Sequence, residues 1–249
     1  AENFQQRHGP SACALGFRVQ NAVEAHRKAL NLGIKDYDSK PNFMELRLPA
    51  VYGVGDSVLF FINRYGQDEN IYDIDFEPIA DANPAANDCG LLYVDHVTHN
   101  VRPGGMKKWA EFYENLFNFK QIRYFDIKGK MTSLVSKAMT SPDGFIRIPI
   151  NESQDPKSQI NEFIDEYNGE GIQHIAMHTD NIFETVKKLR ANGIDFMNTP
   201  NAYFNLIDRR LPGHGEDIEA LREQNILIDG DPSNDEGLLL QIFTDTCIG

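Results

Sequence analysis

Cysteine is scarce in this sequence of 249 residues, which contains only three. Cys13, Cys89 and Cys247 are far apart, their number is odd, and no two of them form a CxxC pair. A disulfide framework and a thiolate zinc site are therefore not expected, and a reducing cytoplasm is the predicted location.

Long apolar runs and clusters of basic residues are also missing. No apolar run approaches the roughly 20 residues that a membrane-spanning helix needs, and residues 1–7 lack the basic-then-apolar pattern of a signal peptide. Lys and Arg number 24 against 37 Asp and Glu, which gives a net charge of −13. An acidic chain without a basic cluster binds nucleic-acid phosphates poorly, so neither a membrane nor a nucleic acid is an expected partner.

What the sequence does contain is an internal repeat. Two segments align without a gap at an offset of 160 residues, and each has a β-like stretch, an amphipathic helix and a glycine turn. The helices are expected near residues 22–30 and 182–191, and Gly33 falls on Gly193. The same alignment puts Ala14 opposite His174.

A middle copy of the repeat begins near Leu92 and contains His96. Its helix, near residues 106–117, has apolar side chains at i, i+3, i+4 and i+7, which make one apolar face. His96 and His174 occupy the same place in their copies and are 78 residues apart. Equivalent strands would direct both imidazoles into one cavity.

The repeat predicts an α+β fold in which repeated βαβββ modules form open, barrel-like sheets around a cavity. Further strands are expected at residues 43–48, 58–62, 132–138, 145–150 and 238–243. A linker near residues 79–88 would separate a partial, metal-free N-terminal domain (residues 1–85, one module) from a catalytic domain (residues 86–249, two modules). Because modules should pair and the last strand ends close to Gly249, we expect that the sequence is truncated at both ends.

Two histidines at matching positions suggest a mononuclear iron site. Non-haem Fe(II) oxygenases bind the metal through two His and one carboxylate, and leave positions open for substrate and O₂. No carboxylate near the pair is a convincing third ligand, because Asp95 should point to the other face from His96, and Glu170 and Asp180 lie in turns. The remaining histidines, such as His99, are expected to be exposed or hydrogen-bonded.

Several longer motifs are spread over the chain, at residues 94–101 (VDHVTHNV), 123–127 (RYFDI), 133–139 (SLVSKAM), 148–152 (IPINE), 169–176 (GEGIQHIA) and 239–243 (LLQIF). Together they resemble the 4-hydroxyphenylpyruvate dioxygenase family of the vicinal oxygen chelate superfamily. The resemblance covers essentially the whole chain and is carried by far more than the two histidines.

The resemblance implies an oxidoreductase that binds one Fe(II) per subunit through His96 and His174. Fe(II) would chelate the 2-oxo acid 4-hydroxyphenylpyruvate, which O₂ converts to homogentisate and CO₂ in tyrosine and phenylalanine catabolism. The family's third ligand is a Glu shortly after the motif that ends at Phe243, so it would lie beyond Gly249. Without that Glu, these residues alone are poorly equipped to hold iron or to turn over. The resemblance also suggests a homo-oligomer.

The resemblance further implies a substrate cavity lined by five polar side chains and one aromatic ring: Ser136, Asn151, Gln159, Gln173, Gln241 and Phe243. Amides both donate and accept hydrogen bonds, which suits recognition of a phenol. Asn151 and Gln241 follow strand-like runs and are the stronger candidates. Gln159 could equally be a surface residue, Ser136 could face solvent, and Gln173 should face away from the neighbouring histidine.

Three other functions are compatible with these residues. Hydroxymandelate synthase uses the same substrate and metal but oxidises the benzylic carbon, although residues 148–151 look more like the ring-hydroxylating branch. A fragment that binds a metal or a small molecule without catalysis is the second. The third is a relative associated with haemolysis or pigment, because homogentisate oxidises to a brown pigment.

Overall fold

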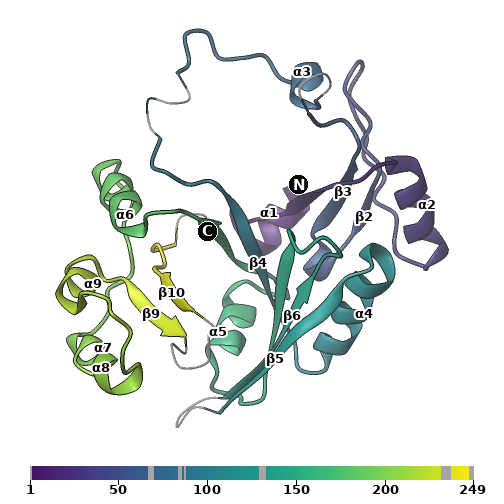
Figure 1. Cartoon of the computed structure of the whole chain (residues 1–249). Coiled ribbons are helices and arrows are strands. Elements are labelled where there is room, and N and C mark those ends of the chain that lie inside the picture. The colour runs from purple at the N-terminus through teal and green to yellow at the C-terminus, as the bar shows by residue number, and fades with distance from the viewer. Residues whose placement is uncertain are drawn as a thin grey trace. The chain divides into compact units, whose positions relative to one another are not determined.

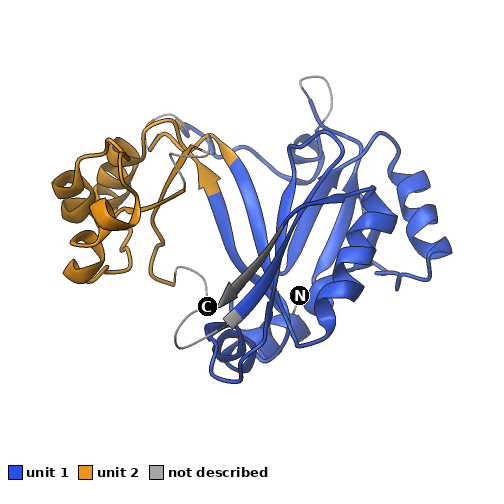
Figure 2. Ribbon diagram, turned by 60° about the horizontal axis from the view of Figure 1, so that its bottom comes forward, with its two compact units in different colours: residues 1–82, 94–176, 248–249 blue, residues 83–93, 177–247 orange. Residues whose placement is uncertain are grey.

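The computed structural model describes residues 2–66, 70–83, 86, 88–128, 133–230 and 237–246. The chain divides into two compact units (Figure 2): residues 1–82 and 94–176 make up nearly all of unit 1, and residues 83–93 and 177–247 make up unit 2. This division follows compactness rather than the order of the modules, so the predicted domain boundary between residues 85 and 86 stays a prediction. Cys247, Gly249 and the predicted strand start at residue 132 lie outside the described residues.

Unit 1 holds the first two modules and most of the first strand of the third (Figure 1). Its elements are α1 (Glu2–His8), β1 (Ala14–Arg18), α2 (Ala22–Asn31), β2 (Ala50–Tyr52), η1 (Val54–Asp56), β3 (Val58–Ile62), α3 (Tyr72–Asp75), β4 (Tyr93–Val101), α4 (Gly105–Phe117), β5 (Lys120–Lys128), β6 (Ser133–Thr140), β7 (Arg147–Ser153), α5 (Gln159–Glu166) and β8 (Gly171–His178). The first residue of β4 and the last two residues of β8 belong to unit 2.

The first module forms a three-stranded sheet in the order β1-β3-β2. β3 is parallel to β1 and antiparallel to β2. Helix α2 starts after Asn21, whose side-chain oxygen accepts a hydrogen bond from the Glu24 N–H at 3.0 Å. Its small residues Ala22 and Ala29 are buried in the same apolar cluster as Phe61 of β3, which fixes the helix on the sheet.

The predicted strand at residues 43–48 is wrong. The Glu45 carboxylate accepts hydrogen bonds from the backbone N–H and the side-chain amide of Asn42, which closes a local turn. The N–H of Leu46 donates to the Asp75 carboxylate at 2.9 Å. Side chains therefore use the backbone groups that a strand would need for pairing.

Helices α2 and α6 confirm the predicted repeat. Both ends of α6 (Ile182–Ala191) lie 160 residues after the corresponding ends of α2. Each helix begins after an asparagine N-cap, Asn21 or Asn181. Each is followed by a glycine with positive φ, Gly33 or Gly193, where the chain turns toward the next segment.

The second module supplies four strands of a five-stranded sheet in the order β5-β6-β7-β4-β8. β6 is antiparallel to β5 and β7, and the first strand of the module, β4, is parallel to the last, β7. The predicted turn at Asp143-Gly144 joins β6 to β7, with Gly144 at a φ of 78°. β8, which opens the third module, lies next to β4.

Helix α4 covers one face of this sheet. Trp109 and Tyr113 of α4 are buried in one cluster with Ile148 and Ile150 of β7, as the predicted apolar face requires. The ring of His99 on β4 also contacts α4, where its Nε2 lies 2.7 Å from the Tyr113 hydroxyl oxygen. This contact fits the expectation that His99 is hydrogen-bonded.

The opposite face of the sheet carries polar side chains. Because side chains alternate along a strand, His96, Thr98 and Asn100 face away from α4 when His99 faces toward it. Asn100 is the register partner of Asn151 on β7, which puts that side chain on the same face. The sheet thus has an apolar face under a helix and a polar face that holds the candidate site.

Unit 2 contains short helices and one hairpin. Beyond α6 these are α7 (Asn201–Phe204), α8 (Ile207–Arg210), α9 (Ile218–Gln224), β9 (Leu227–Gly230) and β10 (Leu238–Gln241). β9 and β10 pair antiparallel, and Phe204, Leu221 and Ile228 belong to the buried cluster of this unit. Among the described residues, no helix has the length and apolarity to cross a bilayer. The helices and mixed sheets together confirm the α+β class.

Candidate metal centre

The two predicted histidines lie side by side on neighbouring strands. His96 is the fourth residue of β4 and His174 is the fourth residue of β8. Their Nε2 atoms are 3.2 Å apart, and their ring planes are inclined by 77°. The structure therefore brings together the pair that the repeat alignment put at equivalent positions.

The other ring nitrogen of each histidine is held by the preceding residue. A carboxylate oxygen of Asp95 lies 2.8 Å from Nδ1 of His96, and the side-chain oxygen of Gln173 contacts Nδ1 of His174. Both oxygens only accept hydrogen bonds, so each Nδ1 carries the ring hydrogen and each Nε2 presents a lone pair. Two lone pairs thus converge on one point, as in metal sites whose histidines are oriented by carboxylates or carbonyls.

Asp95 is in turn held by Arg147, whose Nη1 donates to the other carboxylate oxygen at 2.8 Å. Arg147 is the register partner of His96 on β7, so the sheet itself brings the guanidinium to this place. The prediction that strand alternation separates Asp95 from His96 is wrong. Alternation directs the Cβ atoms to opposite faces, but Nδ1 lies near the backbone and a neighbouring side chain can reach it.

A hydroxyl group lies beside the two converging nitrogens. Thr98 follows His96 by two residues and shares its face of β4, and its Oγ1 is 3.0 Å from Nε2 of His174. Because that nitrogen presents a lone pair, the Thr98 hydroxyl donates and the imidazole accepts. The residue is only 2% exposed.

Burial and charge both favour neutral imidazole at this site. Burial, with the neighbouring His96 as a second cause, lowers the pKa of His174 from 6.5 to about 4. Neutral imidazole is the form that binds metal ions, and it is the form present at neutral pH.

The distance between the two nitrogens fits one metal ion. Two ligands at right angles, each with a metal–nitrogen bond of about 2.1 Å, are about 3.0 Å apart. The described residues contain no cluster of three or more His, Cys, Asp and Glu that could complete the site. Glu170 is used elsewhere, since it accepts hydrogen bonds from the Trp109 indole N–H at 2.9 Å and from the Arg102 N–H at 2.8 Å. Two ligands of a three-residue set are therefore in place.

Three polar residues form a row across the sheet on the face of the histidines. Asn151 on β7 is the register partner of both Asn100 on β4 and Ser136 on β6. Its amide nitrogen donates to the Asn100 side-chain oxygen at 3.3 Å, and Ser136 is 8% exposed. Of the predicted substrate-binding residues, Ser136 and Asn151 therefore lie on the same sheet face as His96.

The other predicted substrate-binding residues are placed differently. Gln159 is an exposed residue at the start of α5, and Gln173 is exposed and contacts the His174 ring. Gln241 and Phe243 are half-buried in unit 2, where Gln241 pairs with Leu227 in the β9–β10 hairpin. The predicted role of these four residues stays a prediction.

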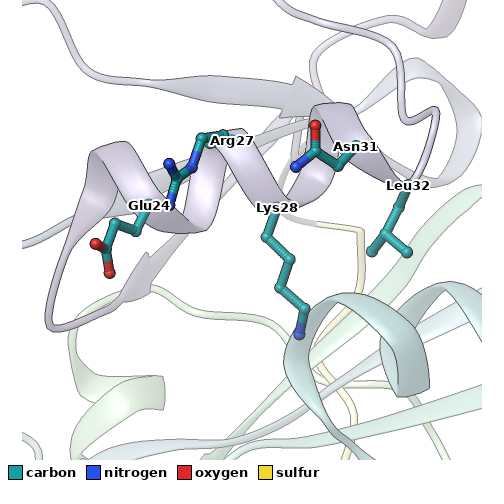
Figure 3. Close-up of a pocket in the computed structure, with 5 residues that line it drawn as sticks. All are labelled: Glu24, Arg27, Lys28, Asn31 and Leu32. Carbon is teal, nitrogen blue, oxygen red and sulfur yellow. The ribbon is translucent and has the colours of Figure 1, made fainter.

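A shallow hollow on helix α2 lies outside this site. It is lined by Glu24, Arg27, Lys28, Asn31 and Leu32, all of them on or just after the exposed side of the helix (Figure 3). Figure 3 shows Lys28 reaching away from α2, and its Nζ donates to the Leu116 carbonyl at the end of α4 at 2.8 Å. This lysine therefore joins two helices, and the hollow contains none of the predicted site residues.

Comparison with known proteins assigns the chain to a family. Residues 1–77 match the family model "Hydroxyphenylpyruvate dioxygenase, HPPD, N-terminal", and residues 93–206 match the model of the "Glyoxalase/Bleomycin resistance protein/Dioxygenase superfamily". The chain is 57% identical over 246 residues to 4-hydroxyphenylpyruvate dioxygenase of Pseudomonas aeruginosa, with 99% of this chain and 68% of the relative covered. The chain belongs to the 4-hydroxyphenylpyruvate dioxygenase family.

Other members and neighbours of the dioxygenase family agree. "Hemolysin VllY" of Vibrio vulnificus is 57% identical over 251 residues, which is 100% of this chain and 70% of the relative. The solved structure of a triple mutant of 4-hydroxymandelate synthase from Streptomyces coelicolor matches with a TM-score of 0.80 and 26% identity, over 99% of this chain and 70% of that one. The family confirms the resemblance carried by the motifs, and it makes the protein an oxidoreductase.

For this dioxygenase, reasoning from the sequence missed the residues that surround the histidines. Thr98 and Asn100 share the parity of His96 on one strand, which was a usable signal. Asp95 and Gln173 directly precede the two histidines, which is a second signal, because the same neighbour serves in both copies. Arg147 could not be found without knowing the register of β4 and β7.

Proposed function

We propose that His96 and His174 bind the Fe(II) ion of this 4-hydroxyphenylpyruvate dioxygenase. The observation that carries the proposal is the convergence of two Nε2 lone pairs at 3.2 Å, with each Nδ1 held by an acceptor. Two histidines leave room for a carboxylate and for substrate, as non-haem iron oxygenases require. The iron content is one ion per subunit.

The repeat supports a place for the third ligand. In the first module the first strand, β1, is parallel to the last, β3, and in the second module β4 is parallel to β7. The third module opens with β8, so its equivalent last strand should follow β10 and pair with β8. A Glu on that strand, expected beyond Gly249, would lie next to His174 and complete the set.

The chemistry divides between the metal and the sheet. Bound Fe(II) supplies a positive charge that organises the 2-oxo acid and O₂ for conversion of 4-hydroxyphenylpyruvate to homogentisate and CO₂. Asp95 and Gln173 orient the two imidazoles, and the polar row of Asn100, Asn151 and Ser136 offers donors and acceptors for the substrate. Gln159, Gln241 and Phe243 are the further proposed contacts of the substrate.

The test is loss of iron and of product on removal of either imidazole. In the protein at its full natural length, His96→Ala and His174→Ala should each weaken Fe(II) binding by more than about 100-fold and abolish homogentisate formation, because each removes a direct ligand. His26→Ala is the matched control, since His26 pairs with Asp36 in another part of unit 1. Bound iron and homogentisate that match the control in either variant would reject the site.

The 4-hydroxymandelate synthase reaction is the second candidate, because that enzyme shares the fold at a TM-score of 0.80. The sequence favours the dioxygenase, since identity to the synthase is 26% against 57% to the dioxygenase of Pseudomonas aeruginosa. Chromatography of the aerobic reaction products decides between them, and hydroxymandelate as main product would overturn the assignment. The homo-oligomer and the cytoplasmic location stay predictions.

A further inference from the structure

Thr98 has a hydroxyl group whose hydrogen-bond partner is one of the proposed metal ligands. Its Oγ1 lies 3.0 Å from Nε2 of His174, and its side chain is almost completely buried. The imidazole accepts this hydrogen bond with the lone pair that a metal ion would use. The hydroxyl and the metal therefore compete for the same lone pair.

Metal binding must leave this hydroxyl without its acceptor. A buried donor without a partner is unfavourable, and structures normally supply one. The neighbouring groups on this face are already engaged: Asn100 accepts from Asn151, and the oxygens of Asp95 and Gln173 hold the two Nδ1 atoms. The next acceptor must come from what binds beside the metal.

We propose that the Thr98 hydroxyl donates a hydrogen bond to a carboxylate or keto oxygen of the 2-oxo acid once the metal is bound. The inference rests on the proposed iron site. Thr98 comes from the same strand and the same face as His96, and its hydroxyl is at hydrogen-bonding distance from the point where the two nitrogens converge. An oxygen that chelates the metal would enter that same space, and a charged acceptor strengthens such a bond.

The proposal gives Thr98 opposite effects on two successive binding steps. The hydroxyl weakens metal binding, because its hydrogen bond to His174 has to break. It strengthens binding of the 2-oxo acid, because a new hydrogen bond forms. A residue that only packs in the sheet would weaken both steps or neither.

The experiment compares Thr98→Val, which has nearly the same shape without a hydroxyl, with Thr98→Ser, which keeps the hydroxyl. Fe(II) binding, and then 4-hydroxyphenylpyruvate binding to the iron-loaded protein, are measured by calorimetry without O₂, in the protein at its full natural length. For Thr98→Val we expect about threefold tighter Fe(II) binding and about tenfold weaker 2-oxo acid binding. Thr98→Ser should match the wild type in both.

Phenylpyruvate, which lacks the phenol hydroxyl, shows which end of the substrate Thr98 contacts. The valine variant should lose the same factor for phenylpyruvate as for 4-hydroxyphenylpyruvate, because both carry the 2-oxo acid group. An unchanged 2-oxo acid affinity, a loss confined to 4-hydroxyphenylpyruvate, or an equal loss in Thr98→Ser overturns the inference. Wild-type protein that binds no Fe(II) would instead reject the proposed site itself.

Discussion

The metal affinity of this chain depends on residues that touch no metal. Asp95 fixes the tautomer of His96 through Nδ1, and Arg147 fixes Asp95 through its other oxygen. An acceptor at Nδ1 keeps the lone pair of Nε2 available, whereas a donor at Nδ1 would move the ring hydrogen to Nε2. The carboxylate therefore sets the chemistry of the imidazole beside it.

Asp95→Asn should weaken Fe(II) binding by about 10- to 100-fold, because an amide can donate to Nδ1 where the carboxylate could only accept. Arg147→Gln should have a smaller effect, since Arg147 is partly exposed and its ion pair is screened by water. Asp38→Asn is a matched control, because Asp38 forms an exposed pair with Arg47 away from the histidines. Calorimetric Fe(II) affinities that do not differ between Asp95→Asn and Asp38→Asn would contradict this role.

A second histidine, His99, makes stability depend on pH. Burial lowers its pKa from 6.5 to about 4, so the folded protein disfavours the charged ring that the unfolded chain accepts. The unfolded state binds more protons between these pH values, and stability is therefore lost as the pH falls from 6.5 toward 4. Over that window the loss from this one residue is about 3 kcal/mol.

His99→Gln should remove this contribution, because glutamine does not titrate. Urea unfolding at pH 4.5 and pH 7 should show a smaller pH difference in the variant than in the wild type, whatever the absolute stability of each. His26→Gln, at a histidine half-exposed beside Asp36, should keep the wild-type difference. The same difference in His99→Gln as in wild type would show that another group causes it.

Strand parity predicted the face that carries the histidines but not the contacts of the residues between them. The 160-residue offset and the parity of His96 were enough to place both imidazoles on equivalent strands. Asp95 and Gln173 escaped that reasoning, because parity describes the directions of Cβ atoms and not the reach of side chains. Thr98 had the right parity, yet threonine in a strand is too common to be singled out without coordinates.

At the scale of elements, the start of β8 is gripped by parts of the first and second modules. The Trp109 indole of α4 holds the Glu170 carboxylate, and the Gly55 backbone of η1 lies against the Glu170 carbonyl. A Cβ at Gly55 would lie 1.8 Å from that carbonyl oxygen. Only glycine allows this close approach.

Gly55→Ala should therefore destabilise the protein by more than about 2 kcal/mol, since it combines a backbone clash with a positive φ of 61°. Gly9→Ala is the control: Gly9 also has a positive φ, of 72°, but has open space around a Cβ. It should cost only about 1 kcal/mol. Equal free energies of unfolding for the two variants would mean that the contact with Glu170 yields freely.

Local hydrogen bonds explain where element predictions failed. Helices at residues 22–30 and 182–191 followed from periodicity and caps, and both are present. Residues 43–48 have strand-like alternation, but the Asn42–Glu45 turn and the Asp75 carboxylate occupy their backbone groups. Such competition depends on a residue far along the chain, which a local pattern does not contain.

At the scale of the whole molecule, a metal on His96 and His174 would join the second module to the third through β4 and β8. A ligand that binds only the folded state stabilises it, by about 2.7 kcal/mol when its concentration is 100 times Kd. Addition of Fe(II) without O₂ should raise Tm, and a chelator should reverse the rise. His174→Ala should lose this response, and a full response in that variant would place the metal elsewhere.

The repeat also lets the molecule serve as its own comparison. The first module keeps the N-cap, helix length and glycine turn of the third, yet has Ala14 where the third has His174. One copy of an ancestral unit thus retained its architecture after duplication without a ligand for metal. Inheritance of the fold and inheritance of the chemistry are separable in this protein, so a histidine at position 14 would test whether an old site can be restored.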